Sequence, residues 1–261
     1  MFGRVIAAHG FEGIYVTGAG IANMSLGVPD IGLVTLTELA EHVAAIAEAV
    51  EIPILADADT GFGNALNMGR TVRLLERAGA AGIQIEDQVF PKKCGHFSGK
   101  QVIACDEMVG KVKAAVDARS DQDLQIVART DARAIEGLDA AIARAQAYAD
   151  AGADVTFVEA PLDIAEMRRI TAEIRVPQIA NMVFGGLTPQ VAESELAQLG
   201  FGGVLYANAA LQAALKSVND VMAALRRDGS LAQVADRLAG FEERQQAVDK
   251  PRYDALEQRY R

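Results

Sequence analysis

Acidic, basic and amide side chains recur at one kind of position in this sequence, directly after a short apolar run. Five successive runs end in this way, at Asp57 and Asp59, Glu86 and Asp87, Arg129 and Asp131, Glu159, and Asn181. Asp57 and Asp59 are two residues apart, so both side chains of a strand end point to the same side. Such carboxylates repel each other unless a cation lies between them, and Mg²⁺ prefers oxygen ligands. We therefore predict that Asp57, Asp59 and Glu86 hold a divalent cation, partly through water; helix caps or ion pairs with Arg129 and Arg133 are the alternative.

A second candidate for chemistry is Cys94, in the stretch Pro-Lys-Lys-Cys-Gly-His between the third apolar run and the next helix. A long loop at this position is typical of a lid over an active site. Lys92, Lys93 and His96 surround the thiol, and neighbouring cations lower the pKa of a cysteine. We therefore predict that Cys94 moves protons near neutral pH. A zinc site is disfavoured because no further Cys or His pair stands at ligand spacing, and Cys105 is expected to be structural.

The elements that must position these residues alternate along the chain. Short apolar runs predict strands buried on both faces at residues 13–17, 53–57, 82–86, 125–129, 155–159, 177–181 and 203–206. Ala-rich stretches with helical periodicity predict helices at residues 37–50, 67–77, 106–118, 137–150, 163–174, 188–199 and 207–228. The two Ala-Gly-Ala pieces at 78–80 and 151–153 are predicted to close helices in the left-handed conformation. This alternation indicates consecutive βα units and a parallel sheet.

The fold class predicted from this order is α/β, as a (β/α)₈ barrel of the TIM type, which typically has about 250 residues. Seven strands are visible and residues 2–9 have a helical pattern, so the first strand is expected to lie upstream and to be missing from this chain. An open doubly wound sheet is the alternative. Residues 1–225 are predicted to form the barrel and residues 226–261 a C-terminal helical arm. That arm is either a solvated helix pair or a segment that packs on a neighbouring subunit.

Composition excludes several classes of partner. A chain of 261 residues with a formal charge of −10 repels nucleic acid and anionic membranes. It has no apolar stretch long enough to span a membrane and no signal-peptide pattern. Two cysteines make no disulfide framework, so a reducing cytoplasm is expected. Gly18 and Gly20 give G-x-G, but Asn23 stands where a dinucleotide site needs its third glycine, so the loop is expected to bind a carboxylate through bare N–H groups instead.

Six blocks of the sequence resemble signature blocks of the isocitrate lyase/phosphoenolpyruvate mutase superfamily. In chain order they are YVTGAGIANMSLGVPD (15–30), DADTGFGNALN (57–67), GIQIEDQ (82–88), KKCGH (92–96), ARTDA (128–132) and ANMVFGG (180–186). The resemblance extends over roughly residues 1–225. It implies a TIM-type barrel with helix swapping between subunits, usually in a homotetramer.

The resemblance also implies a role for each candidate residue. Mg²⁺, with Mn²⁺ as the alternative cation, would be bound directly by Asp57 and through water by Asp59, Glu86 and Asp30. The catalytic set would be Cys94, Arg129 and Tyr15. The residues that bind or line the substrate would be Thr17, Gly18, Ala19, Gly95, His96, Glu159 and Asn181. The partner implied is thus a small carboxylate substrate.

The function implied is a Mg²⁺-dependent carbon–carbon lyase. It would cleave a 2-hydroxy di- or tricarboxylate, of the 2-methylisocitrate or 2,3-dimethylmalate type, to a 2-oxo acid and a carboxylate. Cys94 would protonate the carbon of the enediolate fragment, and its loop is typical of the lyase branch. Residues 97–100 read Phe-Ser-Gly-Lys and depart from the Arg-Pro-Asn run of many methylisocitrate lyases, so the substrate stays open. The alternatives are an oxaloacetate hydrolase, a phosphonomutase-type enzyme and a non-catalytic binding barrel.

Overall fold

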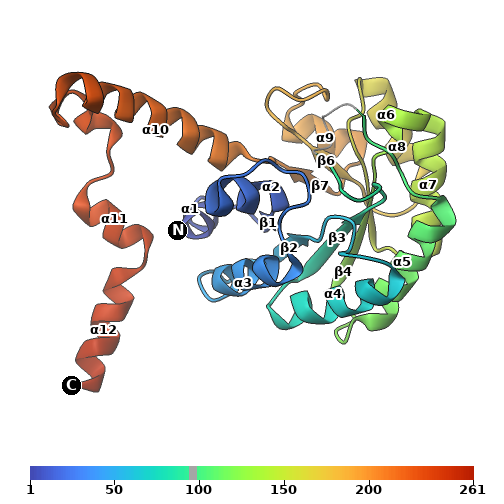
Figure 1. Cartoon of the computed structure of the whole chain (residues 1–261), viewed down its shortest axis with the longest axis horizontal. Coiled ribbons are helices and arrows are strands. Elements are labelled where there is room, and N and C mark those ends of the chain that lie inside the picture. The colour runs from blue at the N-terminus through green and yellow to red at the C-terminus, as the bar shows by residue number, and fades with distance from the viewer. Residues whose placement is uncertain (94–98) are drawn as a thin grey trace. The chain divides into compact units, whose positions relative to one another are not determined.

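The computed structural model describes residues 1–93 and 99–261. The chain forms two compact units, one of Gly13–Asn208 and one of Met1–Glu12 with Ala209–Arg261. The larger unit contains the sheet and the helices that cover it (Figure 1). In the described part of the chain, no helix combines the length and the apolar character that a membrane crossing requires.

The strands of the larger unit are all parallel. A five-stranded sheet runs in the order β1 (Ile14–Val16), β2 (Ile54–Asp57), β3 (Gly82–Glu86), β4 (Gln125–Thr130) and β5 (Val155–Val158). β6 (Ile179–Asn181) pairs with β7 (Gly203–Leu205), and an isolated parallel bridge from Thr156 to Gln178 continues the order from β5. The seven predicted strands and the parallel α/β class are confirmed. Among the described residues no pairing of β7 with β1 closes a ring, and the upstream strand stays a prediction.

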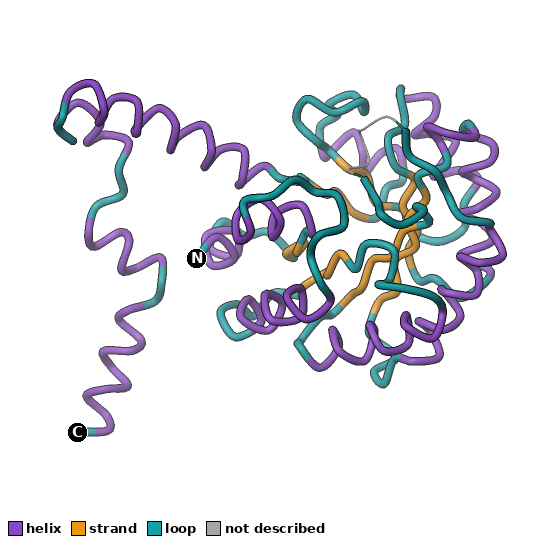
Figure 2. The backbone as a smooth tube through the Cα atoms, viewed as in Figure 1, coloured by secondary structure: helices purple, strands orange, loops and turns teal. Residues whose placement is uncertain are grey.

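Helices cover the outer side of these strands, as Figure 2 shows by the purple coils around the orange strands. In chain order they are α2 (Gly18–Ile21), η1 (Ala22–Leu26), α3 (Leu36–Ala47), α4 (Ala65–Arg77), α5 (Cys105–Ala118), α6 (Arg133–Glu136), α7 (Leu138–Asp150), α8 (Ile164–Glu173) and α9 (Glu193–Leu199). The predicted helices of this unit are present. The one predicted at 188–199 begins later, at Glu193, because Ala192 is extended and Thr188 is buried rather than capping. The short α2, η1 and α6 were not predicted.

Local sequence explains several of these boundaries. Asn64 accepts hydrogen bonds from the backbone of Leu66 and Asn67, which starts α4 with a capping box. Gly79 and Gly152 have φ of 97° and 107°, which confirms the left-handed helix ends predicted there. Every residue of β3 is buried, as expected of a strand covered on both faces. These features fix where each strand ends, and therefore where its last polar side chain lies.

The smaller unit consists of α1 (Phe2–Ala8), α10 (Ala209–Asp228), η2 (Ala232–Arg237), α11 (Phe241–Ala247) and α12 (Lys250–Tyr260). A small apolar cluster of Val221, Ala224 and Val234 joins α10 to η2. The helical character predicted for the end of the chain is thus present. The division of the chain at residues 225 and 226 stays a prediction.

Candidate active site

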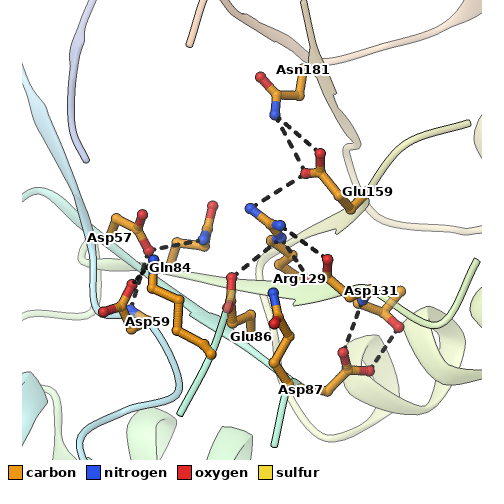
Figure 3. A network of polar contacts seen from close by, with 12 residues as sticks. Asp57, Asp59, Gln84, Glu86, Asp87, Arg129, Asp131, Glu159 and Asn181 are labelled. Atoms are coloured by element: carbon orange, nitrogen blue, oxygen red, sulfur yellow. Dashed lines mark hydrogen bonds and ion pairs between the residues drawn. The ribbon is translucent and has the colours of Figure 1, made fainter. Parts of the chain in front are cut away.

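The carboxyl ends of the parallel strands bring the polar candidates to one edge of the sheet (Figure 3). Asp57 ends β2, Glu86 ends β3, Asn181 ends β6, and Glu159 directly follows β5. Arg129 is the penultimate residue of β4 and is the register partner of Glu86. In a parallel βα fold the active site lies at this edge, because the loops that follow the strands meet there.

Asp57 is held by a side chain of β3 and by the backbone at the start of α2. Its Oδ1 accepts a 3.2 Å hydrogen bond from Gln84 Nε2, and Gln84 Oε1 accepts a 2.8 Å bond from the Tyr15 hydroxyl. The backbone N–H of Gly18 points at Asp57 Oδ2 across 3.4 Å. A Cβ on Gly18 would come 3.1 Å from Asp59 Oδ1, so only glycine lets this backbone approach the aspartates. Burial first, and then Asp57, raise the pKa of Tyr15 well above its usual value, so the phenol stays protonated.

Asp59 lies beside Asp57 in a strained turn. Its φ is 48°, and its backbone N–H donates to Asp57 Oδ1 at 3.2 Å. The Lys92 ammonium pairs with Asp59 Oδ1 at 2.8 Å and with Asp30 Oδ1 at 2.5 Å. Burial and the charge of Asp57 raise the pKa of Asp59 to about 7, although Lys92 acts in the opposite direction. The two aspartates thus behave as a carboxylate pair that lacks sufficient positive charge.

Glu86 provides the test of whether the site fits a cation. The side chain is 2% exposed, and its Oε1 has no hydrogen-bond donor. Burial raises the pKa of Glu86 well above its usual value, and the Arg129 guanidinium that attracts it has its Nε 3.4 Å from Oε2. As the described side chains stand, no three acidic, thiol or imidazole groups converge on one point at ligand distance. The unpaired oxygen and the all-oxygen donor set of Asp57, Asp59 and Glu86 nevertheless fit Mg²⁺, which keeps several waters and needs few direct protein ligands.

Arg129 is the cation on the other side of Glu86 (Figure 3). It binds Asp131 through Nε at 2.9 Å and Nη2 at 3.1 Å, and its Nη1 lies 3.4 Å from Glu159 Oε2. The Asn181 amide donates to both oxygens of Glu159 at 3.5 and 3.4 Å. Burial opposes the charged form of Arg129, but Asp131 and Glu159 raise the pKa of Arg129 above its usual value. The guanidinium therefore stays charged, and the ring of Phe157 stacks under it at 5.2 Å.

Asp87, which also follows β3, faces away from this cluster. It accepts hydrogen bonds from the Thr130 hydroxyl at 2.7 Å, the Tyr148 hydroxyl at 2.7 Å and the Asp131 backbone at 2.9 Å. Arg144 lies 3.6 Å from it. All acceptor capacity of Asp87 is thus turned toward the protein interior, so its role is to hold the β3 and β4 ends together.

A cavity of about 60 Å³ lies between these groups. The residues that line it are Tyr15, Thr17, Ala19, Asp30, Asp57, Glu86, Lys92, Lys93, Arg129, Glu159, Asn181, Val183, Leu205, Ala207 and Asn208. A larger hollow of about 340 Å³ lies between α6, α7 and α8. Its acids mostly form ion pairs, Asp139 with Arg169, Glu136 with Arg144 and Glu166 with Arg133, so the chemistry belongs to the smaller cavity.

Most of the site residues predicted from the sequence line this cavity, and Asp59 contacts the lining residue Lys92. Cys94, Gly95 and His96 lie outside the described residues, so their predicted roles stay predictions. Three further residues, Gln84, Lys92 and Lys100, were not predicted as site residues although they bind Asp57, Asp59 and Asp131. Of these three, Lys92 had one signal, which is its place in the KKCGH block.

The chain is similar to known sequences of one family. The family model of phosphoenolpyruvate phosphomutase matches residues 3–226. The chain is 48% identical over 243 residues to 2,3-dimethylmalate lyase of Eubacterium barkeri, which covers 93% of this chain and 84% of the relative. It is 46% identical over 229 residues to 2-methylisocitrate lyase of Aeropyrum pernix, with 88% and 73% covered.

Solved structures give the same fold. The crystal structure of 2,3-dimethylmalate lyase in its trigonal form superimposes with a TM-score of 0.94 at 32% identity, over 99% of this chain and 87% of that one. A phosphonopyruvate hydrolase in complex with oxalate and Mg²⁺ superimposes with a TM-score of 0.88 at 34% identity, over 99% and 90% of the two chains. The barrel-like arrangement of the strands is thus shared with both.

Proposed function

The chain belongs to the phosphoenolpyruvate mutase/isocitrate lyase superfamily, and from this premise we propose that it is a carbon–carbon lyase. Its substrate is a 2-hydroxy dicarboxylate or tricarboxylate with an alkyl substituent, cleaved to a 2-oxo acid and a second carboxylate. The observation that carries the proposal is the buried cluster of Asp57, Asp59 and Glu86 beside the Arg129 guanidinium, in which Asp57, Glu86 and Arg129 line one small cavity. Such a cluster can bind a metal ion and an anionic substrate together.

The reaction moves one proton from the 2-hydroxyl group to the neighbouring carbon. The bond between the carbon that bears the hydroxyl group and this neighbouring carbon breaks. Its electron pair stays on the departing fragment, and the hydroxyl oxygen becomes the carbonyl oxygen of the 2-oxo acid. Arg129 and the N–H groups of the Thr17–Ala19 loop bind the carboxylate of the 2-oxo acid half. Cys94 gives its thiol proton to the carbanionic carbon of the other half, and the proton that the 2-hydroxyl group loses restores the thiol, so no net proton is consumed. Tyr15, protonated at neutral pH, lines the same cavity and holds the Gln84 amide in place.

Asp57, and through water Asp59, Glu86 and Asp30, would hold a divalent cation, which would supply positive charge for the oxygens of the 2-oxo acid. Mg²⁺ is the proposed cation and Mn²⁺ the alternative. The support is the unpaired Glu86 oxygen and the repulsion between Asp57 and Asp59 described above. Glu159 holds the guanidinium of Arg129, which binds the substrate carboxylate, and Asn181 in turn holds Glu159.

The wall of the cavity supports an alkylated substrate. Val183, Leu205 and Ala207 line it beside the charged groups, and apolar side chains at that place favour a methyl substituent over an unsubstituted malate. The substrate class is therefore that of the two relatives, 2,3-dimethylmalate and 2-methylisocitrate. Oxaloacetate, which has no methyl group, makes no use of these side chains, and a non-catalytic barrel has no need for so many buried charges.

We also propose a homotetramer in the cytoplasm, with residues 1–225 as the barrel and residues 226–261 as an arm that packs on a neighbouring subunit. The support for the arm is that its large apolar side chains are exposed within the smaller unit. They are Leu231, Leu238, Phe241, Val248, Tyr253 and Tyr260. Sedimentation of the full chain would test the subunit number.

The experiment that tests the function is a substrate panel with MgCl₂. Malate, citramalate, 2,3-dimethylmalate, 2-methylisocitrate and oxaloacetate are each assayed for release of a 2-oxo acid and of oxalate. Release of a 2-oxo acid from an alkylated substrate, and little from malate, is expected. Release of oxalate from oxaloacetate alone would assign a hydrolase instead, and no turnover of any compound would contradict the proposal.

A further inference from the structure

We propose that Lys100 is a positioning residue for Arg129: it shares the carboxylate of Asp131, so that the guanidinium keeps its charge and its direction for the substrate carboxylate. This inference rests on the proposed function in taking Arg129 as the group that binds a carboxylate. Lys100 itself lines no part of the cavity. We infer that it acts through Asp131.

The contacts form a buried chain of alternating charges. The Lys100 ammonium donates to Asp131 Oδ1 at 2.6 Å, and the same oxygen accepts from Arg129 Nη2 at 3.1 Å. Asp131 Oδ2 accepts from Arg129 Nε at 2.9 Å. Asp131 is fully buried, and Lys100 and Arg129 are 8% exposed. Water therefore screens these charges little, and each depends on the others.

The number of acids around Arg129 shows why a second cation matters. Three carboxylates lie within 3.4 Å of its guanidinium, those of Glu86, Asp131 and Glu159. Asp131 is the closest and binds through both oxygens, so without a second cation it would cancel the charge of Arg129. Lys100 takes up part of the negative charge of Asp131, and Arg129 keeps more of its own for an incoming anion.

Lys100 is held in place by main-chain hydrogen bonds between the segment that follows it and the residues that follow β3. The backbone of Gln101 accepts a 2.8 Å bond from Val89 N–H, and Ile103 N–H donates to the Asp87 carbonyl at 2.8 Å. The Asp87 side chain in turn accepts from Asp131 N–H at 2.9 Å. The loop segment that follows Lys100 and the segment that carries Asp131 are thus both bound to Asp87, which fixes the distance between them.

The probe for this inference is binding of oxalate in the presence of MgCl₂, measured by calorimetry on the full chain. Lys100→Gln keeps a hydrogen-bond donor but removes the charge, so we expect its oxalate Kd to rise about 10- to 100-fold. Lys100→Arg restores the charge and should bind within about threefold of the wild type. In turnover, KM should rise more than kcat falls for Lys100→Gln, because Arg129 binds the carboxylate before and during the reaction.

A double variant separates electrostatic positioning from a structural role. Lys100→Gln with Asp131→Asn removes one positive and one negative charge together, and it should recover most of the oxalate affinity that Lys100→Gln loses. A merely structural role predicts that the second substitution adds to the damage. Lys113→Gln, at an exposed position of α5, is the matched control.

The outcomes are distinguishable. Equal oxalate binding by wild type and Lys100→Gln, or a double variant weaker than the single one, would overturn the role of Lys100 and leave the proposed function intact. If the wild-type chain itself binds no oxalate with MgCl₂, the carboxylate role of Arg129 fails, and the proposed function and this inference fall together. If Lys100→Gln does not fold, oxalate binding by Lys100→Arg and by the double variant still tests the role of Lys100, because both variants keep the charges at positions 100 and 131 balanced.

Discussion

The phenol of Tyr15 and the amide of Gln84 are joined by a 2.8 Å hydrogen bond in which the phenol is the donor. Because the phenol is protonated, the bond assigns Oε1 of Gln84 to Tyr15 and turns Nε2 toward Asp57, where it donates at 3.2 Å. One neutral side chain thus sets the direction of a candidate metal ligand and of a cavity-lining phenol. Gln84 is fully buried, so water cannot replace either bond.

Gln84→Met should therefore lower kcat/KM about 10- to 100-fold, because it leaves Asp57 and Tyr15 each without one partner in a buried site. The free energy of unfolding should fall by about 1–3 kcal/mol for the same reason. Kinetics with a coupled 2-oxo acid dehydrogenase and thermal unfolding measure the two effects. Gln125→Met is the control, since Gln125 is exposed at the start of β4. Kinetics for Gln84→Met within twofold of wild type would remove Gln84 from the site.

Cys94→Ser should reduce turnover of the alkylated substrate by about 100-fold or more, because a hydroxyl is a far weaker acid than a thiol at neutral pH. Binding of oxalate with MgCl₂ should change much less. The chain provides its own control in Cys105, at the start of α5, where burial raises the pKa of the thiol. Cys105→Ser should turn over substrate at the wild-type rate. Equal turnover by Cys94→Ser would assign the proton transfer to another group.

The fold was largely predictable from the sequence because burial on both faces leaves a simple pattern. β3 is buried along its whole length, and its run of apolar residues ends at Glu86. Gly79 and Gly152 were predictable as helix ends because their backbone requires a left-handed conformation. The start of α9 was not, because Pro189 suits a first helical turn and also an extended segment, and the packing of Thr188 decides between them.

The acidic residues of the candidate site were predictable from the sequence, whereas the side chains that bind these acids were less so. Asp57, Asp59 and Glu86 follow apolar runs, which is a local signal. The partners come from distant segments: Lys92 reaches Asp30 across 62 positions, and Lys100 reaches Asp131 across 31. A lysine in a loop looks solvated in a sequence, and only the fold reveals that it is buried against a carboxylate. Gln84 was missed although it stands two residues before Glu86 in β3 and therefore points to the same face of the strand.

Removal of divalent cations with EDTA should abolish turnover, and MgCl₂ should restore it. Glu86→Gln should raise the Kd for Mg²⁺ about tenfold or more, measured by calorimetry, because the amide replaces a charged donor with a neutral one. Glu51→Gln, an exposed acid that precedes β2, is the matched control and should bind Mg²⁺ as the wild type does. Full activity of the EDTA-treated chain would show that the buried acids serve another purpose.

Glu166 allows a prediction on stability that is independent of the reaction. Its carboxylate forms two hydrogen bonds with Arg133, at 2.5 and 2.9 Å, and it accepts a third from the Leu162 backbone at 2.8 Å. The bonds from Arg133 hold the pKa of Glu166 below its ordinary value. A carboxyl group with a lowered pKa in the folded state stabilises the fold above the unfolded-state pKa, and that stabilisation is lost as the pH falls through the folded-state pKa.

Glu166→Gln should therefore unfold more easily at neutral pH, by about 1 kcal/mol, since both side chains of the pair are 18% exposed and partly screened. The difference from wild type should stay constant down to about pH 5 and shrink below it, because the wild-type carboxylate is then protonated. Urea unfolding at a series of pH values measures this, with Glu41→Gln, an exposed acid of α3, as the control. A difference that persists unchanged into acid would mean that the charge of Glu166 contributes nothing, and that packing or the neutral hydrogen bonds account for the loss.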